Sequence, residues 1–110
     1  MLSRKDLIQI NQEFHTGKVA NLSSLEYALD QAQRSRDWLK AAAVLARAML
    51  IDHVFEDGNK RTAAAVITLY IDVQNCSFDQ QKVDDLVIQI AKKNIQDIRR
   101  ITRLIKNVLQ

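Results

Sequence analysis

The stretch from His53 to Thr62, HVFEDGNKRT, gathers side chains that can move protons and hold charged ligands. It places a histidine, two carboxylates, an amide, a lysine and an arginine around a glycine. The residues on either side, 38–51 and 63–73, are almost wholly apolar. A turn between two buried helices needs only one capping residue, whereas every position from Glu56 to Thr62 is polar or glycine. This density of polar groups predicts a functional site.

Phosphate is the ligand that the second half of the stretch suits best. A helix that begins near Asn59 directs its unpaired N–H groups and the positive end of its dipole into the loop, and Lys60 and Arg61 add two cations there. Gly58 has no Cβ, so the backbone can approach a ligand closely or take a positive φ. The plainer alternative is a polar turn in which Asn59 or Asp57 caps the helix.

Asp57 and His53 complete the predicted chemistry. A carboxylate at Asp57 repels a bound phosphate unless a cation lies between them, and Mg²⁺ binds to both carboxylate and phosphate oxygens. His53 precedes the loop, and histidine can take a proton near neutral pH, so it is the candidate general base for an incoming hydroxyl. Phe55 is apolar between two polar positions, and we expect it to anchor the loop to the core. The implied ligand is a metal-bound di- or triphosphate.

Other site classes lack their residues. There is no GxxxxGK[ST] phosphate loop, and the Asp-Gly pair lacks the alternating ligands of a calcium loop. The only cysteine, Cys76, cannot form an internal disulfide, and with just two histidines beside it there is no set of zinc ligands. We therefore expect any metal to be held by oxygen atoms.

Length and composition indicate a small globular protein. The 110 residues suffice for a single domain, residues 1–110, with one hydrophobic core. Hydrophobic residues make up 47% and charged residues 26% of the chain. No run approaches the roughly 18 apolar residues that span a bilayer, and the N-terminal residues lack the apolar core of a signal peptide. We expect a cytoplasmic protein without a membrane partner.

The formal charge of +3 is concentrated near the C-terminus. Against one acid, Asp97, residues 91–110 hold Lys92, Lys93, Arg99, Arg100, Arg103 and Lys106. These cations could form a nucleic-acid surface. They could also be the solvated face of a terminal helix, whose dipole favours cations near its C-terminus. We favour the second interpretation and do not expect nucleic acid as a partner.

Helices must position these residues, because the chain has no proline and only two glycines. The expected helices are one with Leu7, Ile10 and Phe14 between a Ser3 cap and Gly17; one opened by a Ser23–Glu26 capping box; one from about Asp37 to Asp52; one after the polar stretch; one capped by Asp79; and a last one with Ile95 and Ile98. The two helices around the polar stretch are apolar on most sides and should be central. The fold class is therefore all-α, a bundle of five to six helices.

The stretch His53-Val54-Phe55-Glu56-Asp57-Gly58-Asn59-Lys60-Arg61 resembles the signature of the Fic/Doc superfamily, HxFx[D/E]GNxR, at every fixed position. In Fic adenylyltransferases the residue after the asparagine is usually glycine, and a second arginine follows three positions after the first. Here those places hold Lys60 and Ala64, which resembles the Doc (death-on-curing) branch. That resemblance implies a toxin kinase that moves the γ-phosphate of ATP to a protein hydroxyl.

The resemblance also implies roles for the residues. His53 would deprotonate a target serine or threonine, and Asp57 would hold Mg²⁺. The backbone of residues 58–60 would cradle phosphate, while Lys60 and Arg61 would neutralise charge in the transition state. A lysine fills space that glycine leaves free, so the nucleotide should bind in another orientation than in the adenylyltransferases.

Partners follow from the same resemblance. The best-known target in the family is the translation elongation factor Tu, and a neutralising antitoxin is expected, for which the basic final helix could face an acidic segment. The loop at residues 17–22 corresponds to the family's flap, which aligns a target segment by backbone pairing. Two alternatives stay open: nucleotidyl transfer on the same scaffold, and a noncatalytic module that binds nucleotide without turnover.

Overall fold

Six helices account for most of the chain in the computed structural model, which describes residues 2–110. They are α1 (Arg4–Gln12), α2 (Leu22–Arg34), α3 (Trp38–Leu50), α4 (Asn59–Val73), α5 (Gln80–Lys93) and α6 (Ile98–Lys106). The prediction of an all-α bundle of five to six helices is confirmed. Across residues 2–110, no helix combines the length and the apolar character that crossing a membrane requires.

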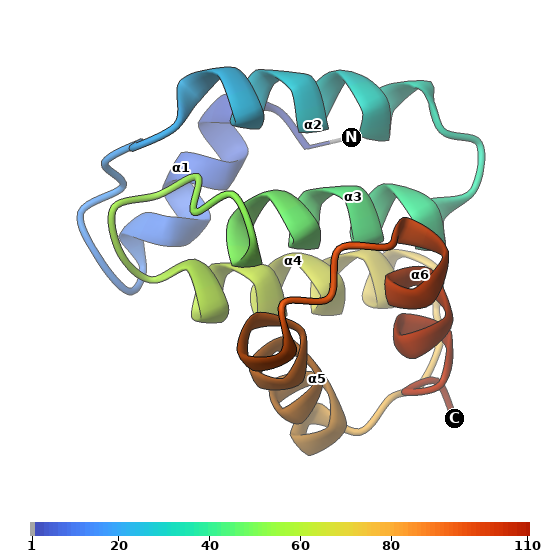
Figure 1. The fold of residues 1–110 in the computed structure, drawn as a ribbon. Helices are drawn as coiled ribbons and strands as arrows, with labels where there is room; N and C mark the ends of the chain where they lie inside the picture. The colour runs from blue at the N-terminus through green and yellow to red at the C-terminus, as the bar shows by residue number, and fades with distance from the viewer. Residues whose placement is uncertain (1) are drawn as a thin grey trace.

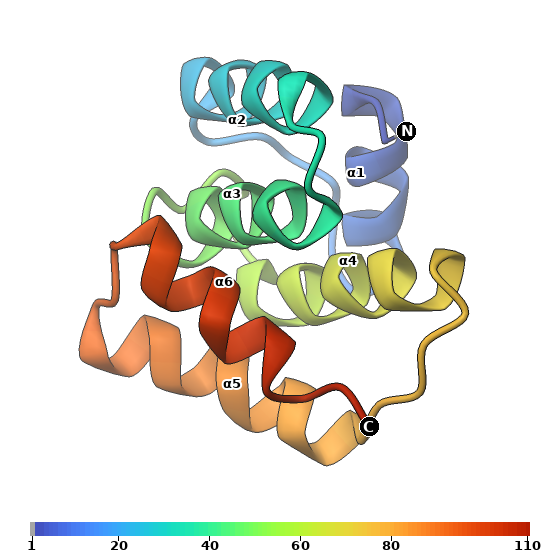
Figure 2. The same ribbon diagram turned by 90° about the vertical axis from the view of Figure 1, so that its right-hand side faces the viewer.

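α3 and α4 form the centre of the bundle, as predicted. α3 packs against α2, α4, α5 and α6, while α4 packs against α1, α3 and α5. Figure 1 shows α2 on one side of α3, with α5 and α6 on the other. The turned view in Figure 2 shows α1 on one side of the bundle, running crosswise beside α2 and α4. The polar stretch consists of the connection between α3 and α4, which we call the polar loop, and the first turn of α4. The two most buried helices therefore hold it on both sides.

Small side chains allow α3 to contact four neighbours at once. Nine of its residues are buried, and five of these are alanines: Ala41, Ala42, Ala43, Ala46 and Ala48. Alanine has the highest helix propensity and leaves room for close helix packing. The larger buried residues Leu45 and Met49 lie among them. Both ends of the polar loop therefore start from rigid, well-packed backbone.

The end of α1 and the start of α2 differ from the sequence prediction. α1 starts with the expected Ser3 cap, but it ends at Gln12, and Phe14 lies beyond it with 37% of its surface exposed. For α2 the capping residue is Asn21, whose side chain accepts a hydrogen bond from the Ser24 backbone N–H; the predicted Ser23 capping box is wrong. The α1–α2 connection therefore runs from the end of α1 at Gln12 to Asn21, whose side chain holds the start of α2 by a hydrogen bond.

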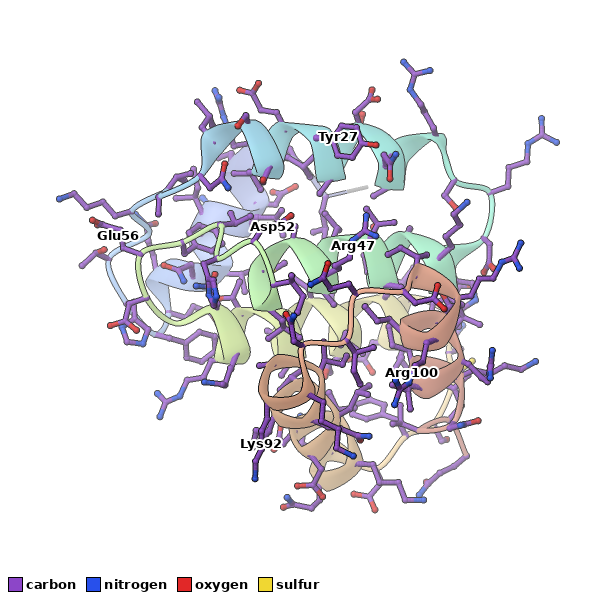
Figure 3. All side chains as sticks on the ribbon, viewed as in Figure 1. Tyr27, Arg47, Asp52, Glu56, Lys92 and Arg100 are labelled. Carbon is purple, nitrogen blue, oxygen red and sulfur yellow. The ribbon has the colours of Figure 1, made fainter. Side chains whose placement is uncertain are left out.

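α6 starts later than predicted, and its apolar residues face the core while its charged residues face solvent, as expected. Asp97 caps α6, so Ile95 belongs to the preceding loop, where it is buried. Ile101 and Ile105 face the core, whereas the six cations of residues 92–106 are exposed, and the ion pairs found among residues 2–110 include none of them. Figure 3 labels Lys92 on α5 and Arg100 on α6 as examples.

Candidate active site

A cleft of about 450 Å³ lies at the junction of α3, α4 and the end of α5. Its lining consists of His15, Leu50, His53, Glu56, Asp57, Gly58, Asn59, Lys60, Arg61 and Ala91. The structure thus brings six of the seven predicted site residues to one cavity. Phe55 is the exception, because its side chain is only 1% exposed and packs in the core below the loop.

The side chain of Asn59 fixes the conformation of the loop. Its Oδ1 accepts a hydrogen bond from the Phe55 backbone N–H (3.0 Å), and its Nδ2 donates to the Phe55 carbonyl (2.8 Å). The amide thus pairs with both polar groups of one residue, as a neighbouring strand would. The Asn59 side chain is therefore used within the loop, and the alternative that it caps α4 is wrong.

The N-terminus of α4 has no side-chain cap. Gly58 holds the capping position with φ 77°, and the Asp57 carboxylate does not bond to a helical N–H group. The first helical bond runs from the Thr62 N–H to the Gly58 carbonyl (2.9 Å), which leaves the N–H groups of residues 59–61 without a partner in the described chain. Unpaired N–H groups and the dipole of a 15-residue helix favour an anion at this point.

Two cations strengthen this anion site. Lys60 and Arg61 are exposed on the first turn of α4, and neither takes part in an ion pair found among residues 2–110. Both line the cleft. Gly58 is required here, since a Cβ at this position would lie 2.2 Å from the Cδ2 of His15, and its φ lies in the region that side chains rarely adopt.

His53 reaches the cleft through an unusual backbone conformation. It follows Ile51, the C-terminal capping residue of α3, by two positions and has φ 52°, in the left-handed region. A non-glycine residue costs of order 1–2 kcal/mol there. Strained residues of this kind cluster at active sites and ligand-binding loops. The left-handed residue turns the chain at the end of α3, and the imidazole lines the cleft with Asp57 and the N-terminus of α4.

The Asp57 carboxylate suits a magnesium ion that carries a phosphate. Its Oδ1 accepts a hydrogen bond from the Gly58 N–H (3.0 Å), its Oδ2 lies 3.7 Å from His15 Nδ1, and the side chain is 79% exposed. Mg²⁺ is commonly bound by one or two carboxylates, with substrate phosphates and water completing its octahedron. The unpaired N–H groups of the anion site begin two residues later, at Asn59, so one cation could contact both the carboxylate and a bound phosphate. Within residues 2–110, no three His, Cys, Asp or Glu side chains converge on one metal position.

The loop between α1 and α2 pairs with the polar loop. Val19 and Phe55 form an antiparallel bridge, in which the Glu56 N–H donates to the Lys18 carbonyl (3.0 Å) and the Ala20 N–H donates to the Val54 carbonyl (2.8 Å). Since the bonds use the residues on either side of Val19, the polar groups of Val19 itself point the other way. They have no backbone partner in the part of the chain that the structure describes, and so form a short open edge beside the cleft.

Two residues of the site escaped the sequence analysis. His15 is one of the two histidines that the sequence analysis considered only as zinc ligands. In the structure it lies over Gly58 and beside the Asp57 carboxylate. Asn11, 1% exposed, donates a hydrogen bond to the Asp57 carbonyl (2.9 Å). The signal for Asn11 was its spacing: it lies four positions after the buried Leu7, on the inward face of α1, where a polar side chain needs a buried partner.

Comparison with known families supports the signature. Residues 2–71 match the Fic/DOC family, a span that includes α1 to α3, the whole polar loop and nearly all of α4. α5 and α6 lie outside the match. No curated protein matches the chain. Because the match covers well over half of the residues, the chain belongs to the Fic/DOC family.

Proposed function

We propose that this protein is a Doc-like kinase that transfers the γ-phosphate of ATP to a serine or threonine hydroxyl of another protein. The observation that carries the proposal is the shared cleft: the uncapped N-terminus of α4, with Lys60 and Arg61, shares it with His53 and Asp57. Phosphoryl transfer requires positioning, neutralisation of charge and a base, and this cleft supplies groups for all three.

The reaction assigns one task to each residue. His53 takes the proton of the target hydroxyl as that oxygen forms its bond to the γ-phosphorus, and the bond from the γ-phosphorus to the bridging oxygen of ADP breaks. The N–H groups of residues 59–61, with the side chains of Lys60 and Arg61, neutralise charge on the transferred group. Asp57 would hold Mg²⁺, which would supply positive charge that offsets the negative charge of the phosphate groups.

Lys60 favours kinase chemistry over nucleotidyl transfer. It is exposed on the first turn of α4 and lines the cleft, where a glycine would leave space for a phosphate. A bulky cation at this point should displace the nucleotide, so that the γ-phosphorus and not the α-phosphorus faces His53. Nucleotidyl transfer is the second candidate, since the family's common scaffold serves both reactions and the rest of the cleft suits either.

The edge at Val19 supports the proposed docking of a target segment. Its N–H and C=O groups are oriented away from the polar loop, and the bridge to Phe55 holds the Val19 segment against the loop that carries His53 and Glu56. An extended peptide that pairs with this edge would bring its hydroxyl to the cleft, with affinity from backbone hydrogen bonds. We propose a translation factor as the target, on the family resemblance.

A neutralising protein partner is part of the proposal, and a second hollow could receive its acidic segment. This hollow of about 490 Å³ lies over α3, between α2 and the start of α6. Lys40, Arg47 and Arg99 line it against a single acid, Asp97, whose carboxylate already caps α6. Figure 3 labels Arg47 and the exposed Tyr27, which both border it. Charge complementarity favours an acidic segment here.

The position of the label decides between the candidates. The protein is incubated with Mg²⁺, cell extract and ATP labelled at either the γ- or the α-phosphate, with a His53→Ala variant as control. We expect a labelled protein band from γ-labelled ATP alone, and none with the variant. Label from α-labelled ATP would show nucleotidyl transfer. Nucleotide binding without any label would show a noncatalytic module.

A further inference from the structure

Asn11 and Thr62 are the only polar side chains buried in the core among residues 2–110, and they contact each other directly beneath the active site. Asn11 is 1% exposed and Thr62 is 0% exposed. The Nδ2 of Asn11 donates to the Thr62 Oγ1 (3.0 Å) and also to the Asp57 carbonyl (2.9 Å). Its Oδ1 accepts from the Gly17 N–H (2.9 Å). One side chain thus joins α1, α4, the polar loop and the α1–α2 connection.

The hydrogen bond from Asn11 to the Asp57 carbonyl fixes the orientation of more than one group. The carbonyl belongs to the same rigid peptide unit as the Gly58 N–H, so fixing the direction of the carbonyl also fixes that of the N–H. The Gly58 N–H in turn bonds to the Asp57 Oδ1 (3.0 Å). Asn11 therefore orients the carboxylate through the intervening peptide plane. The same plane leads into Gly58, the residue directly before the three unpaired N–H groups of the anion site.

The bond to Gly17 extends this control to the open edge. Gly17 has φ 77°, and the next residue, Lys18, begins the segment that pairs with residues 54–56. A Cβ on Gly17 would lie 2.5 Å from the Cγ of Gln12, so the chain must pass close to α1 here. Asn11 holds that close approach. The two glycines of the chain, Gly17 and Gly58, are thus adjacent to the two ends of one buried amide.

We propose that Asn11, supported by Thr62, is the positioning residue for the magnesium–phosphate site of this protein. The inference rests on the proposed function, because the carboxylate that Asn11 orients is the expected metal ligand. Groups that orient a metal ligand typically change metal affinity or activity by roughly 10- to 100-fold when they are removed. A residue with a purely structural role would change the free energy of unfolding and leave the magnesium dependence as it is.

Thr62→Val and Thr68→Val make a matched pair for the test. Both threonines lie on α4, and both substitutions exchange a hydroxyl for a methyl group. The Thr62 hydroxyl accepts from Asn11, whereas the Thr68 Oγ1 is buried and has no hydrogen-bond partner in the described chain. Asn11→Ala removes the whole connection, and Thr62→Ser restores the hydroxyl as a conservative variant. Circular dichroism shows which variants are folded before any comparison is made.

Two measurements follow on each folded variant. In the first, Mg²⁺ is titrated against the protein with a non-hydrolysable ATP analogue, and the Gly58 and Gly17 amides are followed by ¹⁵N–¹H spectroscopy, where glycine signals lie apart from most others. In the second, the rate of label transfer is measured as a function of Mg²⁺ concentration. We expect Asn11→Ala and Thr62→Val to raise the half-saturating Mg²⁺ concentration roughly tenfold or more. Thr68→Val and Thr62→Ser should match the wild type.

The outcomes separate the two claims. Wild-type magnesium dependence in folded Asn11→Ala and Thr62→Val proteins would overturn the positioning role of Asn11 and leave the proposed function standing. If the wild type binds Mg²⁺ and nucleotide but transfers no label, the proposed kinase function falls, while the titration still measures the effect of Asn11. If the wild type binds neither, both claims are wrong.

Discussion

Replacing His53 by glycine should make the protein more stable and inactive. His53 has φ 52°, its side chain is exposed, and it forms no hydrogen bond within the described residues. Relief of left-handed strain gains about 1–2 kcal/mol. The greater freedom of glycine in the unfolded chain offsets about 0.5–1 kcal/mol of this gain. The free energy of unfolding should therefore rise by between about 0 and 1.5 kcal/mol, with a central value of about 0.75 kcal/mol. For a domain of this size, that central value raises the Tm by about 3–5 °C.

His53→Ala is the comparison that separates strain from chemistry. Alanine has a Cβ and keeps the strain, so its Tm should stay near that of the wild type. Both variants lack the proposed base and should lose roughly a hundred- to ten-thousand-fold in the rate of label transfer. Asn75→Gly serves as a second control, because Asn75 has φ 56° at the far end of α4. It should gain stability and keep its activity.

Thermal melting and label transfer on the same preparations test this reasoning. A His53→Gly protein that melts below the wild type would show that the imidazole stabilises the loop, contrary to the strain argument. Transfer at the wild-type rate in either His53 variant would refute its role as the base. Stabilisation together with inactivity would mean that the fold holds a strained residue where function requires it.

Three further predictions concern the supports of the site and the core. Burial raises the pKa of Tyr70 above its usual value of 10.0. Above about pH 10 the folded state keeps a proton that the unfolded chain loses, so Tyr70 lowers stability there and adds no pH dependence at lower pH. Urea titrations should therefore show stability falling above about pH 10, and falling less steeply in Tyr70→Phe. Asn59→Asp places an oxygen against the Phe55 carbonyl and should lower the free energy of unfolding by about 1–3 kcal/mol in urea titrations. Gly58→Ala should shift the melting curve downward and abolish transfer, because its Cβ would strike His15; His15→Ala added to it would restore only part of the stability, since the positive φ remains.

Much of the fold could be predicted because local signals and tertiary packing agree. The predicted caps Ser3 and Asp79 each precede a helix in the structure, and the apolar segments around the polar stretch are the central helices. The α1–α2 connection was harder to predict. Asn21 and Ser23 can both cap a helix, and only the pairing of residues 18–20 with residues 54–56 decides where α2 begins.

The part of the site that consecutive residues form could be predicted from the sequence. Residues 53–61 are contiguous, so their chemistry can be seen without a structure. Asn11 acts on Asp57 from 46 positions away, and that distance is closed only when α1 packs on α4. Asn59 was open to two roles, as a helix cap or as a phosphate-binding residue, and its role as a support of the loop was not predicted. Its bidentate pairing with Phe55 depends on a loop shape that spacing alone does not define.

The mass of the modified target tests the central claim most directly. The labelled protein is isolated after reaction with the wild type and with His53→Ala, and its mass and modified residue are determined by mass spectrometry. We predict the addition of one phosphoryl group to a serine or threonine, present with the wild type and absent with the variant. Addition of a nucleotidyl group, or the same phosphorylation with His53→Ala, would contradict the account.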